Sequence, residues 1–241
     1  MERSHLLAQL AADPSAAAIL LDVDGTLAPI VSRQEDARVP ETTRALLREL
    51  ASRFALVACV SGRTSSDAML VVGVDELLYI GTHGLELSPE AGAWRDQIEL
   101  FATNIAWPPE WIAENKGLTL ALHYRQAPEP LKARHALERI AEQAEEVGLR
   151  ARFGRLLLEI LPPIAVDKGT AIHAALAERG IKRALYAGDD STDLDAFRAL
   201  DDLELAVRVA IVSSEAPPGL TEAADLVVAG PAELVELLRA L

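Results

Sequence analysis

The fold class follows from the stretch AAILLDVDGT, residues 17–26. It is a short apolar run that ends in acidic residues and a glycine, a pattern typical of a buried strand followed by a turn. Phe54–Val60 and Leu77–Ile80 have the same form, and an amphipathic helix opened by Pro40 is predicted between the first two runs. Strands that are apolar on both faces and alternate with helices indicate a parallel sheet covered on both sides.

The same alternation returns near the end of the chain. The elements predicted there are a helix from Lys168 capped by Asp167, strands at Ala184–Ala187, Leu205–Val212 and Leu226–Val228, and a helix opened by Pro231. We therefore expect both ends of the chain to form one α/β domain, a Rossmann-like parallel-sheet core made of residues 1–88 and 164–241.

The middle of the chain has a different periodicity. In Leu118–Arg125 and Arg155–Leu161 every second residue belongs to an apolar stripe, which predicts strands of a half-open sheet. Asp96–Ala113 and Leu131–Val147 have helical spacing, and helices there would cover the apolar face. We therefore predict an α+β cap domain at residues 89–163, inserted into the core.

Composition and charge exclude several classes of function. There are 23 basic and 37 acidic residues, a net charge of -14, so the chain should repel nucleic acid and anionic membrane surfaces. No secretory signal or membrane-length apolar run is evident, and the single cysteine, Cys59, is expected to be a buried small hydrophobe. These features predict a cytoplasmic location. The sequence leaves the oligomeric state open and is compatible with a monomer.

Polar clusters follow the predicted core strands. They are Asp22, Asp24 and Thr26 after the first strand, Ser61, Gly62 and Arg63 after the second, and Asp189, Asp190 and Asp193 after Ala184–Ala187. Lys168 differs, because it begins a helix instead of following a strand. Ligands of open parallel sheets bind beyond the carboxyl ends of the strands, so we expect these clusters to meet at one site.

Phosphate-ester hydrolysis is a reaction that this set of residues can carry. Asp22 can attack phosphorus and form an aspartyl-phosphate. Asp24 can protonate the leaving oxygen and later activate water. The Asp22 carboxylate and Asp189 are hard oxygen ligands of the kind that Mg²⁺ prefers. Such an ion offsets the repulsion between an anionic nucleophile and an anionic substrate.

Phosphoryl oxygens need cationic, hydroxyl and amide partners. The predicted phosphate-binding residues are Thr26, Ser61, Gly62, Arg63 and Lys168. Each motif taken alone is also compatible with a solvated turn. A calcium loop is excluded, because position six of the acidic loops is Leu27 or Leu194, where glycine is needed.

The four motifs together resemble those of the haloacid-dehalogenase-type phosphatases. They read Asp22-Val-Asp24-Gly-Thr26, Ser61-Gly-Arg63, Lys168-Gly and Gly188-Asp-Asp-Ser-Thr-Asp193. The resemblance implies catalytic roles for Asp22, Asp24 and Lys168, and Mg²⁺ as the cofactor. It implies metal ligation by the Asp22 side chain, the Asp24 backbone carbonyl and Asp189, and we assign Asp190 and Asp193 to the same metal site. It also implies a cap inserted between the second and third motifs.

Longer stretches resemble the trehalose-6-phosphate phosphatases. They are Leu20–Ile30, Gly81–Glu86, Leu120–Arg125, Asp167–Ala171 and Gly188–Asp193. Two positions depart from that family's pattern: Thr82 stands where it usually has asparagine, and Leu161 stands where an arginine is common. The resemblance implies a small-molecule phosphosugar substrate, trehalose 6-phosphate, hydrolysed to trehalose and phosphate.

The open face of the predicted cap sheet independently favours a hydroxyl-rich ligand, because charged groups bind hydroxyls through directed hydrogen bonds. The predicted substrate-binding residues are His83, Lys116, His123, Arg125 and Glu159, and Arg155 is expected on the same face as the last three. Glu159 also matches the substrate-binding glutamate of the family it resembles. For each residue alone, a solvated sheet face is an equal interpretation.

Other functions stay open at this point. The same chemistry would serve another phosphosugar, such as sucrose phosphate, a mannosyl or glucosyl glycerate phosphate, or a hexose phosphate. A phosphosugar mutase would return the phosphoryl group to a sugar, and a sugar-phosphate sensor would bind without turnover. The Asp22–Asp24 pair disfavours a pure sensor, which has no need of a nucleophile beside an acid.

Overall fold

The computed structural model describes residues 3–31, 33–108, 111–124, 126–154, 156–212, 217 and 219–241. The chain divides into two compact units, one made of Met1–Gly84 with Val166–Leu241 and the other of Leu85–Ala165. The second unit is therefore a single insertion into the first, in the part of the chain where we predict a cap at residues 89–163. Its role as a cap stays a prediction.

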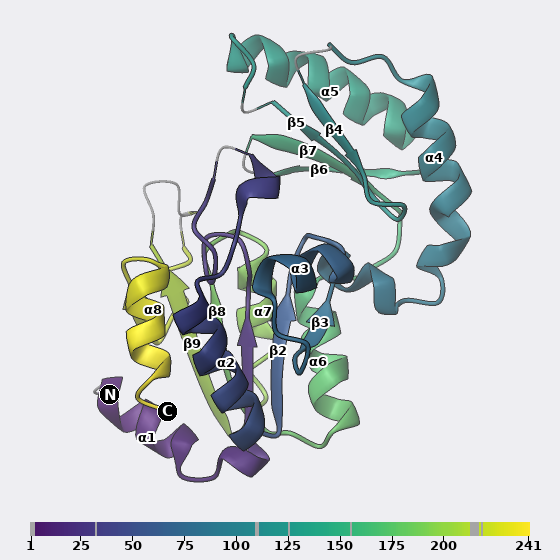
Figure 1. Cartoon of the computed structure of the whole chain (residues 1–241). Helices are drawn as coiled ribbons and strands as arrows, with labels where there is room; N and C mark the ends of the chain where they lie inside the picture. Colours follow the sequence, from purple (N-terminus) through teal and green to yellow (C-terminus); the bar gives the residue numbers. More distant parts are fainter. Residues whose placement is uncertain are drawn as a thin grey trace. The chain divides into compact units, whose positions relative to one another are not determined.

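The first unit contains a six-stranded parallel sheet in the order β10-β9-β8-β1-β2-β3 (Figure 1). Its strands are β1 (Ala18–Leu21), β2 (Leu56–Val60), β3 (Leu78–Ile80), β8 (Arg183–Gly188), β9 (Leu205–Ile211) and β10 (Leu226–Val228). The direction of winding reverses at β1, which pairs with β2 on one side and with β8 on the other. Such a switch point opens a crevice at the carboxyl ends of the strands. The predicted Rossmann-like core is confirmed.

Helices cover both faces of this sheet. They are α1 (Arg3–Ala11), α2 (Glu41–Arg53), α3 (Ser65–Val72), α6 (Lys168–Glu178), α7 (Asp193–Arg198) and α8 (Pro231–Leu238). Neighbouring residues of β1 belong to different hydrophobic clusters: Ile19 lies in one with residues of α1, α2, α3 and α8, and Leu20 in another with residues of α6 and α7. This two-sided burial explains why the strand is apolar at every position.

The second unit is an antiparallel sheet with helices on one face. The strand order is β4-β5-β7-β6, with β4 at Ile112–Asn115, β5 at Leu120–His123, β6 at Arg150–Gly154 and β7 at Leu157–Leu161. Two helices, α4 (Arg95–Asn104) and α5 (Pro130–Glu146), contribute Ile98 and Leu137 to a cluster that also contains Leu122 and Leu158. This is the α+β architecture that the alternating pattern predicts.

One predicted helix is wrong in its second half. The helix predicted over Asp96–Ala113 ends at Asn104, and Ile112–Asn115 forms strand β4 instead. Pro108 explains the break, because proline has no amide hydrogen and disfavours a helical conformation at the residue before it. Antiparallel pairing with β5 then holds the segment extended. As a consequence Lys116 follows a strand, whereas the prediction places it before the first strand of the insert.

The chain leaves the first unit and returns to it at one place. Gly84 has a φ of +97°, and a Cβ built on it would lie 2.5 Å from the Cβ of Ala171 and 3.3 Å from Val166 Cγ1. There is no room for a side chain here, which is why glycine occupies the position. The last residues before the insertion therefore contact the first residues after it.

No helix in the described part of the chain is both long enough and apolar enough to cross a membrane. The cytoplasmic location and the monomeric state stay predictions.

Candidate active site

Three buried carboxylates gather where β1 and β8 end. Asp22 directly follows β1, Asp189 directly follows β8, and Asp193 begins α7. One oxygen from each lies within 4.8 Å of the others, and the three residues are 5%, 2% and 0% exposed. The Lys168 Nζ donates to Asp22 Oδ1 at 2.6 Å and to Asp193 Oδ1 at 2.7 Å. The convergence expected at the carboxyl ends of parallel strands is therefore present.

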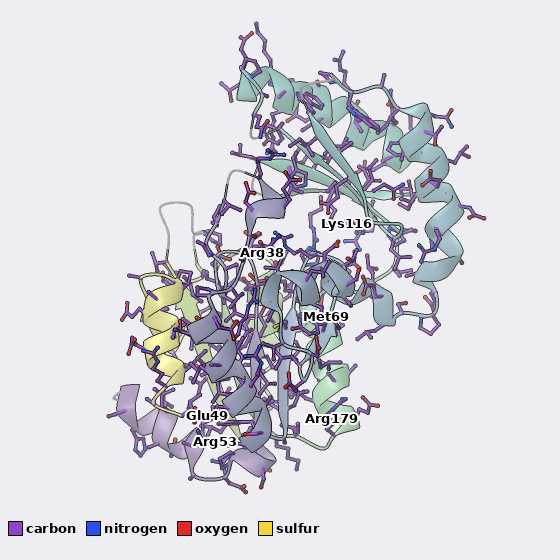
Figure 2. All side chains as sticks on the ribbon, viewed as in Figure 1. Arg38, Glu49, Arg53, Met69, Lys116 and Arg179 are labelled. Atoms are coloured by element: carbon purple, nitrogen blue, oxygen red, sulfur yellow. The ribbon has the colours of Figure 1, made fainter. Side chains whose placement is uncertain are left out.

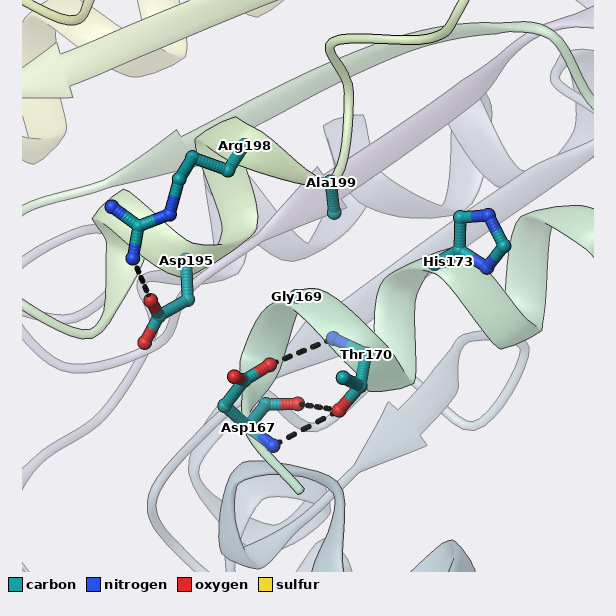
Figure 3. Close-up of a pocket in the computed structure, with 7 residues that line it drawn as sticks. All are labelled: Asp167, Gly169, Thr170, His173, Asp195, Arg198 and Ala199. Atoms are coloured by element: carbon teal, nitrogen blue, oxygen red, sulfur yellow. Dashed lines mark hydrogen bonds and ion pairs between the residues drawn. The ribbon is translucent and has the colours of Figure 1, made fainter. Parts of the chain in front are cut away.

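The first turn of α6 places Lys168 in this cluster. Asp167 caps the helix: its carboxylate accepts from the Thr170 amide at 2.8 Å, and its own amide donates to the Thr170 hydroxyl at 3.0 Å (Figure 3). A Cβ on Gly169 would lie 2.5 Å from the carbonyl oxygen of Asp195, so only glycine lets α6 and α7 approach this closely. The pocket in Figure 3, formed around these first turns, is lined by none of the three carboxylates.

Asp193 is the most completely bonded member of the cluster. Its Oδ1 accepts from Lys168 and from the Tyr186 hydroxyl at 2.6 Å, and its Oδ2 accepts from the amides of Asp189 and Asp190, both at 2.8 Å. A carboxylate offers about four lone-pair sites, so these four bonds use all of them. Asp193 therefore organises the loop after β8 and has no lone pair left for a cation.

Asp189 and Asp190 point to different places. A Cβ on Gly25, which has a φ of +83°, would lie 2.2 Å from Asp189 Oδ2, so the Asp189 carboxylate rests against the turn after β1. The Asp190 carboxylate instead accepts from the amide (2.7 Å) and hydroxyl (3.2 Å) of Ser191. Among the residues that the structure describes, the carboxylate cluster includes Asp189 and not Asp190. Asp190 as a metal ligand has no support in this geometry.

The cluster carries surplus negative charge. Burial raises the pKa of the Asp22 carboxyl well above its usual range; Lys168 opposes that shift, and the charges of Asp193 and Asp189 add to it. Burial alone would lower the pKa of Lys168, but Asp193 and Asp22 raise it, so this side chain is a cation. One lysine faces three carboxylates, and hard oxygen donors with excess charge fit a metal ion. Asp22 and Asp189 are the residues that could hold it.

Burial also fixes the protonation state of Tyr186. Its hydroxyl has a raised pKa, first because it is buried and second because Asp193 and Asp22 lie near it. The phenol therefore keeps its proton and donates it to Asp193. Tyr186 is absent from the predicted site, because a tyrosine within an apolar strand carries no signal of this role in the sequence.

The loop after β2 is held by the turn after β3. The Thr82 amide donates to the Arg63 carbonyl at 2.7 Å, and the His83 amide donates to the Ser61 carbonyl at 2.9 Å. A Cβ on Gly62 would lie 2.7 Å from His83 Nε2, so the imidazole covers this glycine. Two consecutive non-glycine residues, Thr82 (φ +47°) and His83 (φ +54°), adopt left-handed backbone conformations there. Residues in this region are strained, and such strain is often found at functional sites.

Two predicted phosphate-binding residues have other surroundings. Arg63 makes a two-pronged ion pair with Asp24, with Nε to Oδ2 at 2.7 Å and Nη2 to Oδ1 at 2.8 Å. Thr26 is fully buried, and its hydroxyl has no hydrogen-bond partner within the described ranges. Ser61 is buried beside Arg63, whose backbone amide donates to its hydroxyl oxygen at 3.1 Å, so the Ser61 hydroxyl hydrogen can still be donated elsewhere.

The face of the second unit's sheet that lies opposite its hydrophobic cluster is polar. Cross-strand register puts Glu114, Ala121, Glu159 and Arg152 in one row across all four strands. Arg152 pairs with Glu159 at 2.5 Å. Glu114 lies 3.6 Å from the Lys116 Nζ and 3.4 Å from His123 Nε2.

Two residues of this polar face, Glu114 and Arg152, are missing from the sequence prediction. Arg150 and Arg152 alternate with apolar Ala151 and Phe153, a signal that could have found Arg152. Figure 2 labels Lys116, which follows β4. Arg125, and Arg155 as well, lie outside the described residues.

The parallel sheet, the acidic turn after β1 and the lysine that bridges two carboxylates define a protein of the haloacid-dehalogenase-type phosphatase class. Within that class the chain belongs to the trehalose-phosphatase family, whose model matches residues 20–225.

Known proteins resemble the chain in sequence and in structure. Trehalose-phosphate phosphatase B of Arabidopsis thaliana is 30% identical over 210 residues, covering 76% of this chain and 55% of that protein. A crystal structure of a trehalose-6-phosphate phosphatase related protein aligns with a TM-score of 0.73 at 27% identity, covering 92% of this chain and 95% of that one. The C-terminal domain of the Candida albicans trehalose synthase regulatory protein has the same fold, with a TM-score of 0.73 at 15% identity over 98% of this chain and 97% of that one. The chain spans about half the length of the curated trehalose-phosphate phosphatases it matches.

Proposed function

We propose that the chain is a Mg²⁺-dependent phosphatase that hydrolyses trehalose 6-phosphate through a covalent phosphoryl group on Asp22. The observation that carries the proposal is the buried Asp22–Lys168–Asp193 contact, with Asp189 alongside, in a member of the trehalose-phosphatase family. A buried anionic nucleophile beside a fixed cation is suited to attack on a phosphate ester.

In the first half of the reaction an Asp22 oxygen bonds to phosphorus while the bond from phosphorus to the sugar oxygen breaks. The leaving oxygen takes a proton from the Asp24 carboxyl, which becomes a carboxylate. Lys168, already hydrogen-bonded to Asp22, compensates charge on the phosphoryl oxygens. The Ser61 hydroxyl and the amides of its loop are the other proposed phosphate donors.

In the second half water attacks the phosphorus, Asp24 takes a proton from that water, and the bond between phosphorus and Asp22 breaks. Inorganic phosphate leaves, and both aspartates return to their starting states. A Mg²⁺ ion bound by Asp22, Asp189 and the Asp24 carbonyl would offset the repulsion between carboxylate and phosphate. Asp193 acts by holding Lys168 and the loop after β8.

The polar face of the second unit is the proposed sugar-binding surface. Glu159, His123 and Lys116 lie there with their partners Arg152 and Glu114. Paired charges keep these long side chains in defined orientations, so that hydroxyl groups of a disaccharide can bond to them at little entropic cost. Arg125 belongs to the same proposal.

A non-catalytic sensor is the second candidate, because the same fold occurs in a regulatory protein. Fold likeness alone therefore does not separate catalysis from regulation. Asp22 and Asp24 favour catalysis, since each has a chemical role in turnover and a protein that only binds has no need of the pair.

The test is release of inorganic phosphate from a panel of phosphosugars, with and without Mg²⁺. We expect turnover of trehalose 6-phosphate that EDTA stops and Mg²⁺ restores. Asp22→Asn should lower kcat at least about 1,000-fold, because the nucleophile is lost, whereas the matched surface control Asp202→Asn should retain it. Rapid turnover by Asp22→Asn, or activity insensitive to EDTA, would exclude this mechanism. Turnover of a different phosphosugar would keep the chemistry and replace the substrate.

A further inference from the structure

We infer that Arg63 is a positioning residue for Asp24, the proposed acid and base, and not a ligand of the substrate phosphate. The inference rests on the proposed function and deepens it, since it assigns the part of the site that delivers the proton to the leaving sugar.

Arg63 and Asp24 form a bidentate ion pair, in which two guanidinium nitrogens bind the two oxygens of one carboxylate; we call this arrangement the fork. Nε and Nη2 of Arg63 donate to the two oxygens of Asp24 at 2.7 and 2.8 Å. The Arg63 side chain is 7% exposed, while that of Asp24 is 41% exposed. The buried guanidinium thus binds the Asp24 carboxylate from the interior, and the rest of the Asp24 side chain stays exposed to solvent. Two parallel hydrogen bonds fix the plane of a carboxylate, which a single bond cannot do.

The backbone under Arg63 is itself fixed. Its amide donates to the Ser61 hydroxyl at 3.1 Å, and its carbonyl accepts from the Thr82 amide at 2.7 Å. Thr82 and His83, in their left-handed conformations, hold this loop from the turn after the neighbouring strand β3. A short loop whose backbone is held at both of these points fixes where the guanidinium lies, which a residue that orients another side chain requires.

The two half-reactions explain why such a support is useful. Asp24 has to give a proton to the sugar oxygen and then take one from water, which requires the same carboxyl at two nearby points. A carboxyl oxygen that carries a proton can still accept an N–H bond, so the fork can persist in both states. Once the proton has left, the guanidinium stabilises the carboxylate that remains. Arg63 then acts on the reaction through Asp24.

This role predicts a dependence on the leaving group. A sugar alkoxide needs a proton in order to leave, whereas p-nitrophenolate leaves without one. In single-turnover experiments, which follow release of the alcohol and not the later attack of water, Arg63→Gln should slow the sugar phosphate that the wild type hydrolyses about 100-fold and p-nitrophenyl phosphate at most about 3-fold. Arg63→Lys should show the same selectivity, because lysine keeps the charge and loses the fork. Arg139→Gln, an exposed arginine on α5, is the matched control and should change neither.

A double-mutant cycle separates this role from phosphate binding. In the Asp24→Asn background, Arg63→Gln should cost no further activity on the sugar phosphate, because the carboxyl through which it acts is already disabled. Equal losses on both substrates, a raised KM for both, or additive losses in the cycle would overturn the inference. Single-turnover release of p-nitrophenolate, which needs no proton from Asp24, reports that each variant is folded. A wild-type protein that hydrolyses no phosphosugar would refute the proposed function itself, which is a different result from equal losses in an active enzyme.

Discussion

Thr82 has a left-handed backbone conformation, which asparagine adopts more readily than threonine does. Its φ of +47° lies in the left-handed region, where β-branched residues are rarely found and where asparagine is several-fold enriched. Asparagine is also the usual residue here in the family that the sequence resembles. The side chain is fully buried, but asparagine and threonine are similar in size. The strain at this position is therefore a property of the side chain, and the turn itself serves to hold the loop of Ser61 and Arg63.

We predict that Thr82→Asn stabilises the protein by about 1 kcal/mol, the lower end of the cost of such strained residues. That gain corresponds to a rise in Tm of about 2–4 °C for a chain of this size. Thr82→Ala is the control: like asparagine it has no branch at Cβ, but it lacks the amide group whose local hydrogen bonds favour the left-handed region, so it should not stabilise. Thermal unfolding followed by circular dichroism measures both. A Thr82→Asn variant that melts at or below the wild-type temperature would show that the strain is relieved in some other way.

At the scale of elements, the four strands of the second unit assemble a polar row from residues that are far apart in sequence. Glu159 on β7 is 4% exposed and is held by Arg152 on β6, and the row ends at Glu114 on β4. A carboxylate held in this way is a strong acceptor for sugar hydroxyls.

We predict that Glu159→Ala raises KM for trehalose 6-phosphate about 10- to 100-fold, the loss expected for hydrogen bonds to a charged group. KM for p-nitrophenyl phosphate, which has no sugar, should change by no more than about 2-fold, since the lost hydrogen bonds are those to the sugar. Glu159→Gln keeps the shape of the side chain and should give a smaller effect, and the exposed Glu142→Ala on α5 should give none. Steady-state kinetics on both substrates decides the matter; parallel changes would mean that this face does not bind the sugar.

At the scale of the whole molecule, the buried carboxylates of the candidate active site lower the free energy of unfolding at neutral pH. The folded protein binds the Asp22 proton more tightly than the unfolded chain does, because the pKa of this carboxyl is raised by burial and by Asp193 and Asp189. Its favourable contribution to folding is therefore complete at low pH and is lost as the pH rises from the usual aspartate range through the raised pKa. A bound cation should oppose this loss.

We predict that Asp22→Asn melts several degrees above the wild type at pH 8 in EDTA, and that the difference shrinks towards pH 4. Mg²⁺ should raise the Tm of the wild type more than that of Asp22→Asn, since binding to the folded state stabilises it. Scanning calorimetry over this pH range, with Asp202→Asn as the surface control, measures both effects. A difference in Tm that is the same at every pH would mean that Asp22 titrates no differently in the folded and unfolded chains.

Much of the fold follows from local patterns. Each core strand is a short apolar run with a glycine or polar turn after it, and this pattern is enough to predict β1, β2, β8 and β10 together with the order of the helices. The same rule predicts that Asp22 and Asp189 meet, because parallel strands carry the residues after them to one edge. The helix predicted over Asp96–Ala113 is too long, since the apolar periodicity continues past the point where Pro108 forbids a helix.

Residue order alone establishes the class of the protein, its nucleophile candidate and the carboxylates around it, because these depend on short-range spacing and on the direction of the strands. The partner that each charged side chain takes is set by the folded chain: Arg63 binds Asp24, Arg152 binds Glu159, and Asp193 is saturated by Lys168, Tyr186 and two amides. Those pairings depend on register and loop geometry between segments distant in the chain, and residue order carries no direct record of such contacts.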